Sequence, residues 1–127
     1  MQKSNRNIDF IFDKIIELVE GGWHQNIMAK NSKGEPVYIE DRDAASFDLY
    51  GAFCRVFYLH PNMLSYRERT INAIIAALNA TGEKKGLHEF AKSANWHYHV
   101  NKFNDALGRS KMEVVRLLQK AKEKANA

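Results

Sequence analysis

The fold is decided at residues 103–115, FNDALGRSKMEVV, where a polar turn leads into the start of the last helix. The side chains of Asn104 and Asp105 can each accept backbone N–H groups, and Asx side chains of this kind stabilise sharp turns. Ser110 and Glu113 have the spacing of a capping box, in which the two residues satisfy N–H groups at a helix N-terminus. The stretch therefore predicts a structured turn followed by a helix that reaches almost to the C-terminus.

The predicted last helix has an apolar side and a basic side. The apolar side is expected to pack on the first helix and consists of Val114, Leu117, Leu118 and Ala121. The net charge of +4 lies wholly on residues 109–127, where six basic residues meet two acidic ones. The basic face consists of Lys111, Arg116, Lys120, Lys122 and Lys124. Cations are favourable near the C-terminal end of a helix dipole, so a solvated face is the simplest interpretation.

The first helix is predicted from a wide apolar stripe that begins at Ile8, with Asn7 as its N-cap and Gly21 as its C-cap. The polar segment before it, residues 1–6, is expected to be a flexible tail. After the helix, a glycine-containing turn between two short segments predicts a small β-hairpin near residues 27–39.

A second helix is expected to begin near Asp41 or Asp43 and to end at about Leu59. Gly51 lies in the middle of this helix, where a glycine costs roughly 1 kcal/mol relative to alanine. We therefore expect another helix to approach closely at this position.

Three further helices are predicted from capping signals and apolar periodicity. Ser65 and Glu68 have capping-box spacing and predict a third helix that ends at Gly82, and a short fourth helix is expected after Gly86. Residues 96–100 fit a strand or a helix, and the longer helical pattern, which extends to Leu107, favours a helix. The chain is thus expected to be mainly α, a compact helical bundle of four to six helices with one small hairpin.

Length and composition indicate a single cytoplasmic domain. With 127 residues the chain is large enough for one hydrophobic core, so residues 1–127 are expected to form one domain. No apolar run approaches the roughly 20 residues that span a bilayer, and the N-terminus does not resemble a signal peptide. Cys54 is the only cysteine, which excludes an internal disulfide and fits a reducing compartment. We expect no membrane partner, and the sequence leaves the oligomeric state open.

No residue pattern indicates a catalytic, metal or cofactor site. His97 and His99 would share a face only in a strand, since a helix turns them about 200° apart, and zinc needs further ligands. Cys54 lies within a predicted helix, where cysteine is more often a small apolar residue than a nucleophile. Asp41 and Asp43 are explained as helix caps. The sequence therefore predicts no catalytic residue, no metal and no cofactor.

A short segment after the first helix is a candidate binding site. Trp23 follows a double glycine and has polar neighbours, and such a tryptophan can anchor a protein interface. The simpler alternative is that its indole covers the end of the first helix as part of the core. The full set of candidate binding residues is Trp23, His24, Gln25, Asn104, Asp105 and Arg109.

Asn104 and Asp105 also have a purely structural interpretation. Their side chains would accept backbone N–H groups within the turn that precedes Ser110. Arg109 would then pair with Asp105 across that turn, an interaction worth little if it is exposed.

Several of these residues resemble the pattern of a little-characterised family of small bacterial and phage proteins. The pattern begins with Trp-x-Gln, continues with Gly-x-Pro and Gly-Ala, and ends with aromatic-Asn-Asp, Arg-Ser/Thr and Glu-Val before Leu-Leu. The matching residues are Trp23, Gln25, Gly34, Pro36, Gly51, Ala52, Phe103, Asn104, Asp105, Arg109, Ser110, Glu113, Val114, Leu117 and Leu118. The chain departs from the pattern at Asn26, where members often have glycine, and at Asp48, where they often have cysteine. The resemblance implies a shared fold and no established activity.

We expect a non-enzymatic protein that binds another protein, because no catalytic pattern is found. Small phage or mobile-element proteins with this profile often occupy a host component, including defence complexes, and the chain is interpreted by this analogy. One alternative is binding of a nucleic acid or an acidic partner through the basic last helix. Another is an enzyme in which residues 23–25 and 104–105 meet at one concave site.

Overall fold

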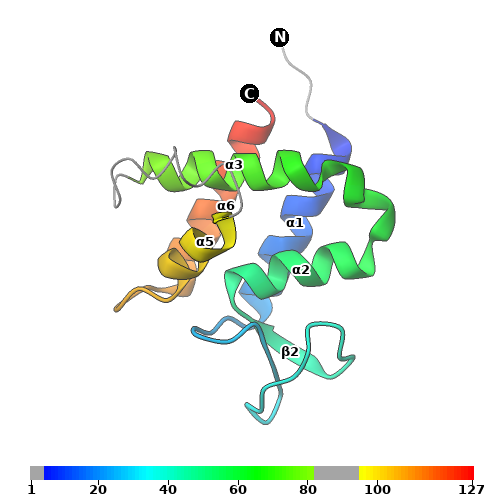
Figure 1. Cartoon of the computed structure of the whole chain (residues 1–127), viewed down its shortest axis with the longest axis vertical. Helices are drawn as coiled ribbons and strands as arrows, with labels where there is room; N and C mark the ends of the chain where they lie inside the picture. The colour runs from blue at the N-terminus through cyan, green and yellow to red at the C-terminus, as the bar shows by residue number, and fades with distance from the viewer. Residues whose placement is uncertain (1–4, 82–94) are drawn as a thin grey trace.

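The computed structural model describes residues 5–81 and 95–127, and within them it confirms a mainly α fold with a small antiparallel sheet (Figure 1). The elements are, in order, α1 (Arg6–Gly21), β1 (Ala29–Asn31), β2 (Ala44–Phe47), α2 (Leu49–Leu59), the 3₁₀-helix η1 (Pro61–Tyr66), α3 (Arg67–Ala80), α5 (Trp96–Asn104) and α6 (Lys111–Ala125). The predicted short helix after Gly86 lies outside the described residues, as do residues 1–4 of the predicted tail.

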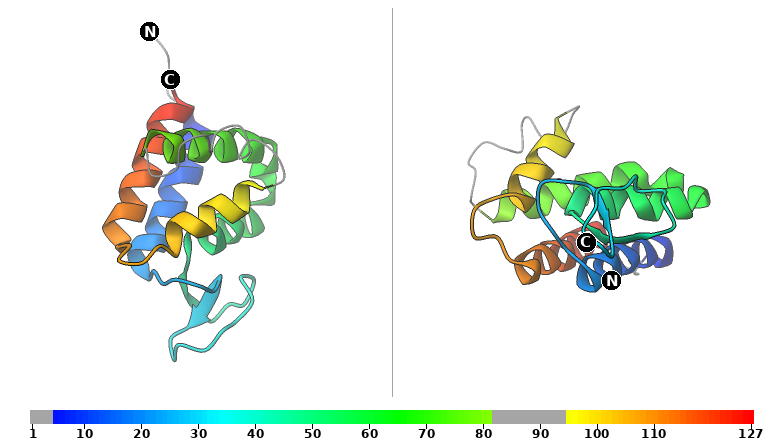
Figure 2. Two further views of the ribbon diagram at one scale, coloured as in Figure 1. Left: turned by 60° about the vertical axis from the view of Figure 1, so that its left-hand side comes forward. Right: turned by 90° about the horizontal axis from the view of Figure 1, so that it is seen from below.

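The helices form two layers, with α1 packed against α6 in one layer and with α2 and α3, which η1 joins, in the other (Figure 2). The core side chains of α1 are Ile8, Ile11, Phe12, Ile15 and Val19, all fully buried. Those of α6 are Val114, Val115, Leu117, Leu118 and Ala121. Helix α6 also packs against α3, and α5 lies against α2 and α3. The apolar periodicity of the first and last helices therefore predicted the packing of α6 on α1.

The two ends of the described chain are joined at the start of α1. Asn5 is the N-cap, and its Oδ1 accepts the backbone N–H groups of Asn7 and Ile8, both at 3.0 Å. The backbone N of Asn5 donates to Oδ1 of Asn126 at 2.8 Å. Asn7 is thus wrong as the predicted cap, because Asn5 begins the helix two residues earlier.

The capping box before α6 is confirmed. Ser110 Oγ accepts the N–H of Glu113 at 3.2 Å, and the N–H of Ser110 donates to Glu113 Oε1 at 2.9 Å. The box predicted at Ser65 and Glu68 is wrong, since Ser65 lies inside η1 and the N-cap of α3 is Tyr66, which makes no capping bond.

The predicted second helix is shortened by a strand. Residues 44–47 form β2, which pairs with β1 in the register Ala29↔Phe47, and α2 begins only at Leu49 with Asp48 as its N-cap. The sheet is therefore present, but its second strand lies beyond the predicted range 27–39. Inside that range, Lys30 and Pro36 form only an isolated bridge.

Residues 96–104 are helical, as predicted. Helix α5 buries Trp96, Val100 and Phe103. Its predicted extension to Leu107 is wrong, because the helix ends at Asn104 and the side chain of Leu107 is fully exposed. Among the helices of the described ranges, none combines the length and apolarity needed to cross a membrane.

Candidate functional site

The two segments singled out in the sequence, residues 23–25 and 104–105, meet beside the N-terminus of α2. Asn104 is fully buried at their centre. Its Oδ1 accepts Trp23 Nε1–H at 2.6 Å and the backbone N–H of Leu49 at 3.0 Å. Its Nδ2 donates to the carbonyl of His24 at 3.2 Å and to Asp105 Oδ1 at 2.9 Å. The amide thus uses both donors and both acceptor positions within the protein.

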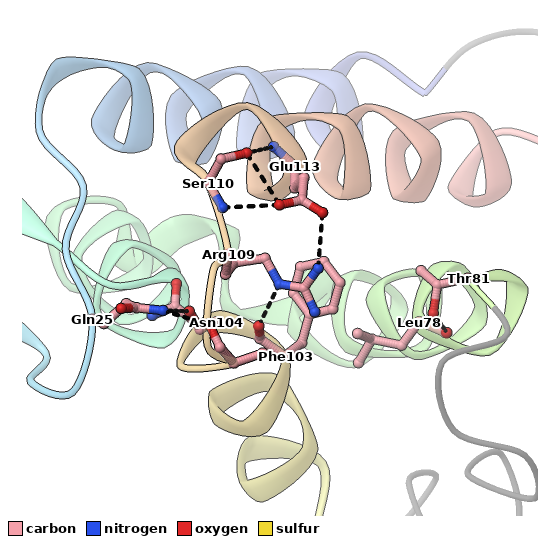
Figure 3. Close-up of polar contacts among 9 residues, drawn as sticks. Gln25, Leu78, Thr81, Phe103, Asn104, Arg109, Ser110 and Glu113 are labelled. Carbon is pink, nitrogen blue, oxygen red and sulfur yellow. Dashed lines mark hydrogen bonds and ion pairs between the residues drawn. The ribbon is translucent and has the colours of Figure 1, made fainter.

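Gln25 and Asp105 complete this network. Gln25 Nε2 donates to the carbonyls of Asn104 at 3.1 Å and Ala106 at 2.9 Å, which satisfies carbonyl groups where α5 ends (Figure 3). Asp105 Oδ1 accepts the N–H of Asn26 at 2.8 Å, and Asn26 has a φ of 74°. We call the set Trp23, Gln25, Asn26, Asn104 and Asp105 the polar lock.

Asn104 and Asp105 have the predicted structural role as acceptors of backbone N–H groups, but the predicted donors are wrong. Both accept backbone N–H groups, but the donors are Leu49 and Asn26, far from the turn before Ser110. Arg109 does not pair with Asp105 in the way predicted. It donates from Nε to the Phe103 carbonyl at 2.7 Å and from Nη1 to Glu113 Oε2 at 3.1 Å (Figure 3).

Asp48 and Gly51 extend the polar lock into α2. Asp48 is buried, and its Oδ1 accepts the N–H of Gly51 at 2.6 Å. Burial, with a smaller contribution from the charge of Asp105, raises the pKa of Asp48 to about 6 against the opposing effect of the Gly51 N–H. A Cβ on Gly51 would lie 2.0 Å from the carbonyl oxygen of Met28. The close approach predicted at Gly51 exists, but its partner is the loop at Met28 instead of another helix.

His24 lies beside the polar lock with its imidazole turned inward. Its Nε2 donates to the carbonyl of Ile27 at 2.6 Å, which leaves Nδ1 to accept the hydroxyl of Ser46. Burial lowers the pKa of His24, so the neutral ring is favoured. The indole of Trp23 is likewise committed to Asn104. The segments that would form an enzyme site therefore hydrogen-bond to each other.

The predicted basic face of α6 is divided between two neighbours. Lys111 Nζ donates to the carbonyl of Glu20 at 3.1 Å, and Lys122 Nζ pairs with Asp13 at 2.8 Å, both on α1. Arg116 and Lys120 lie on the other side of the helix, at a pocket against α3. Only part of the predicted basic face is thus directed away from α1.

The pocket has a volume of about 300 Å³ and lies between α3, α5 and α6. Ala77, Phe103 and Leu117 provide buried apolar wall, and Arg116 and Lys120 provide exposed cations. Arg109 also borders it, with its guanidinium 3.8 Å from the centre of the Phe103 ring and its side chain only 6 % exposed. The spacing of these cations along the last helix predicts a basic face but not a pocket, because α3 supplies the facing wall.

Cys54 and the α5 histidines show no arrangement that activates them. Burial raises the pKa of the Cys54 thiol, and a hydrogen bond with Tyr50 opposes the shift only in part, so the thiol form is favoured. His97 and His99 lie on a helix, and the ring of His97 is 5.9 Å from that of Tyr50. In residues 5–81 and 95–127, no group of three or more His, Cys, Asp or Glu side chains could hold a metal ion.

A known protein family covers nearly the whole chain. The family model described as "Family of unknown function (DUF6197)" matches residues 8–124. No curated protein and no solved structure matches the chain. The matched range includes the whole polar lock and the residues of the pocket.

Proposed function

The chain belongs to the DUF6197 family of unknown function, and we propose that it acts by binding another protein. One observation carries this proposal: three large apolar side chains are exposed where α2 ends and η1 follows it. Tyr58, Leu59 and Leu64 are 51, 50 and 54 % exposed. Apolar side chains that gather on the surface are typical of protein-binding sites. We call these three residues the apolar corner.

The apolar corner is held in place by well-formed backbone structure. The N–H of His60 donates to the carbonyl of Val56 at 2.9 Å, and the N–H of Met63 donates to that of His60 at 2.9 Å. The His60 ring packs edge-on against Phe10 of α1, with centroids 5.0 Å apart. A surface that is already ordered loses little conformational entropy on binding, which favours association.

The polar lock supports a binding role over catalysis. Both polar atoms of the Asn104 side chain are engaged by protein partners, and the Trp23 indole N–H is engaged by Asn104. A substrate at this place would have to break bonds that connect three segments of the fold. We therefore place the partner site elsewhere on the surface.

The biological setting is also our proposal. Following the resemblance to small bacterial and phage proteins, we propose that the chain is encoded by a phage or mobile element. Its partner would then be a host component such as a defence complex, in the cytoplasm. The support is the analogy with proteins of this size and profile, together with the single cysteine.

The test removes the apolar corner and keeps the fold. The double variant Leu59→Ser/Leu64→Ser and the control Leu107→Ser, which alters a fully exposed leucine on the α5–α6 turn, are used as tagged baits in a bacterial extract. Circular dichroism confirms that each bait is folded. We expect the natural chain and the control to retain one partner, and the double variant to bind the purified partner at least tenfold more weakly. Equal binding by the double variant, or no partner above the tag-only background, would refute the proposal.

A second candidate function is binding of a nucleic acid or another acidic partner through α6. The observation that favours it is that Arg116 and Lys124 form no ion pair within residues 5–81 and 95–127. A salt titration distinguishes the two functions. Phosphate contacts make the logarithm of the binding constant fall steeply with the logarithm of the salt concentration, whereas binding at the apolar corner gives a shallow slope.

A further inference from the structure

The pocket between α3, α5 and α6 offers an apolar wall of limited size. Ala77, Phe103 and Leu117 are buried, and Ala80 lies at the edge. A volume of about 300 Å³ is at the lower end of the range for small-molecule sites. The wall therefore suits a single ring or a short acyl chain, whose burial releases water from apolar surface.

The cations at this pocket outnumber the carboxylates. Arg109, Arg116 and Lys120 border it, and Glu113 is the one acidic residue among the lining residues that the structure describes. Glu113 is already engaged, with Oε1 bonded to Ser110 and Oε2 to Arg109. With the residues that the structure describes, Lys120 forms one ion pair, a long one to Glu123 at 3.7 Å. The electrostatic balance of the pocket thus favours an anionic ligand.

The geometry favours an anion with one charge. Ala80 is the last residue of α3, and the partial negative charge of the carbonyl groups at a helix C-terminus opposes a dianion such as phosphate more strongly than it opposes a carboxylate with one charge. A carboxylate has one charge, and its two oxygens match the parallel N–H groups of an arginine such as Arg116. Phe103 is fixed below the guanidinium of Arg109, so this wall is formed before any ligand arrives.

We propose that this pocket binds a small organic carboxylate, with its carboxylate group at Arg116 and Lys120 and its apolar body against Ala77, Phe103 and Leu117. This site is separate from the apolar corner and does not depend on the protein-binding function. The ligand class is a free monocarboxylate with a short aliphatic or aromatic body.

The first experiment compares three probes with the full chain. Hexanoate, hexanamide and inorganic phosphate are titrated while the backbone amide signals are followed by NMR. We expect hexanoate to shift the signals of Ala77, Thr81 and Leu117 in a saturable way. Hexanamide lacks the charge and phosphate lacks the apolar body, so both should bind at least tenfold more weakly. No saturable shift with hexanoate, or equal binding of hexanamide or phosphate, would overturn the proposal.

Two variants test the two halves of the pocket. Arg116→Gln/Lys120→Gln removes the cations, and Lys33→Gln/Arg42→Gln is its charge-matched control in the exposed loop between β1 and β2. Ala80→Phe fills the pocket, and Ala76→Phe, which borders a different hollow on α3, is its control. We expect both pocket variants to lose at least tenfold in hexanoate affinity and both controls to keep it.

The charge variant decides the result if Ala80→Phe does not fold, because Arg116 and Lys120 are exposed and their replacement leaves the core unchanged. Unchanged hexanoate affinity in Arg116→Gln/Lys120→Gln would overturn the proposal. The same holds if the control variants lose affinity to the same extent.

Discussion

The polar lock and the pocket use neighbouring residues at the end of α5 and in the turn after it in opposite ways (Figure 3). In the polar lock, polar side chains from segments 81 residues apart satisfy each other, and the central amide of Asn104 is fully buried. Phe103, the residue before Asn104, instead lines the pocket, where exposed cations border an apolar wall. The comparison teaches that the most distinctive sequence motif stabilises the fold, whereas ordinary Ala, Leu, Arg and Lys residues form the surface that is open to a ligand.

The physical reason for this division is the cost of burying polar groups. A buried donor or acceptor is tolerated only when it is hydrogen-bonded, so a network such as the polar lock fixes which segments meet. Exposed cations carry no such requirement, because water solvates them. Changes at the two regions should therefore differ sharply in their effect on stability.

The largest effect is expected at the contact that supports α2. In Gly51→Ala the new Cβ would lie 2.0 Å from the Met28 carbonyl oxygen, so backbone must move. We expect the free energy of unfolding to fall by about 3 kcal/mol or more in urea denaturation. The control is Gly21→Ala, where a Cβ meets nothing within 4 Å. A folded Gly51→Ala protein as stable as the control would show that this contact is not a constraint.

The next effect is expected at the centre of the polar lock. Asn104→Ala leaves the Trp23 indole N–H, the Leu49 N–H and the His24 carbonyl without their partner, at a cost of about 2–3 kcal/mol. The control on the same helix is Asn101→Ala, since Oδ1 of Asn101 is buried without a hydrogen-bond partner among the described residues and its removal should cost little. The same unfolding experiment checks both, and equal losses would argue against the polar lock.

A pH-dependent effect of intermediate size is expected at Asp48. The pKa of Asp48 is raised from 3.8 to about 6, so the folded state prefers the protonated form. The stabilisation is complete below pH 3.8 and is lost as the pH rises through about 6. Asp48→Asn keeps an N-cap acceptor without the charge. The free energy of unfolding of Asp48→Asn, relative to that of the natural chain, should increase by on the order of 2 kcal/mol from pH 4 to pH 7. Urea unfolding of both proteins across this pH range checks the prediction. A constant difference between their free energies of unfolding would contradict it.

The smallest effect is expected on the pocket side. Arg116 is exposed and makes no hydrogen bond or ion pair with the residues that the structure describes. Arg116→Ala should therefore change the free energy of unfolding by less than about 0.5 kcal/mol. Thermal melting checks this, and a loss as large as that of Asn104→Ala would remove the contrast between the two regions.

Local signals in the sequence predicted much of the helical fold. The apolar stripe from Ile8 and the capping box of Ser110 and Glu113 gave the first and last helices, because both depend on spacing within one segment. The start of α2 was missed because Asp41, Asp43 and Asp48 are equally good caps. The choice among them depends on the pairing of residues 44–47 with β1, which is not local.

The sequence singled out the residues of the candidate site but did not predict the hydrogen bonds that they form. Trp23, Gln25, Asn104 and Asp105 stood out as polar or aromatic residues at chain turns, and the structure brings them together. Their roles could not be derived because Leu49 and Asn26 contribute only backbone N–H groups, which every residue but proline carries. The pocket was missed for a similar reason, since its walls come from three helices whose relative placement the sequence does not state.

The most direct test of the central claim is a double-mutant cycle on the hydrogen bond between Trp23 and Asn104. Trp23→Phe removes the indole N–H, and Asn104→Ala removes its acceptor. Free energies of unfolding are measured for the natural chain, both single variants and the double variant. If the polar lock holds the fold together, the double variant should lose about 1–2 kcal/mol less free energy of unfolding than the sum of the losses of the two single variants. Strictly additive losses would contradict this account and would return residues 23–25 and 104–105 to the list of candidate functional sites.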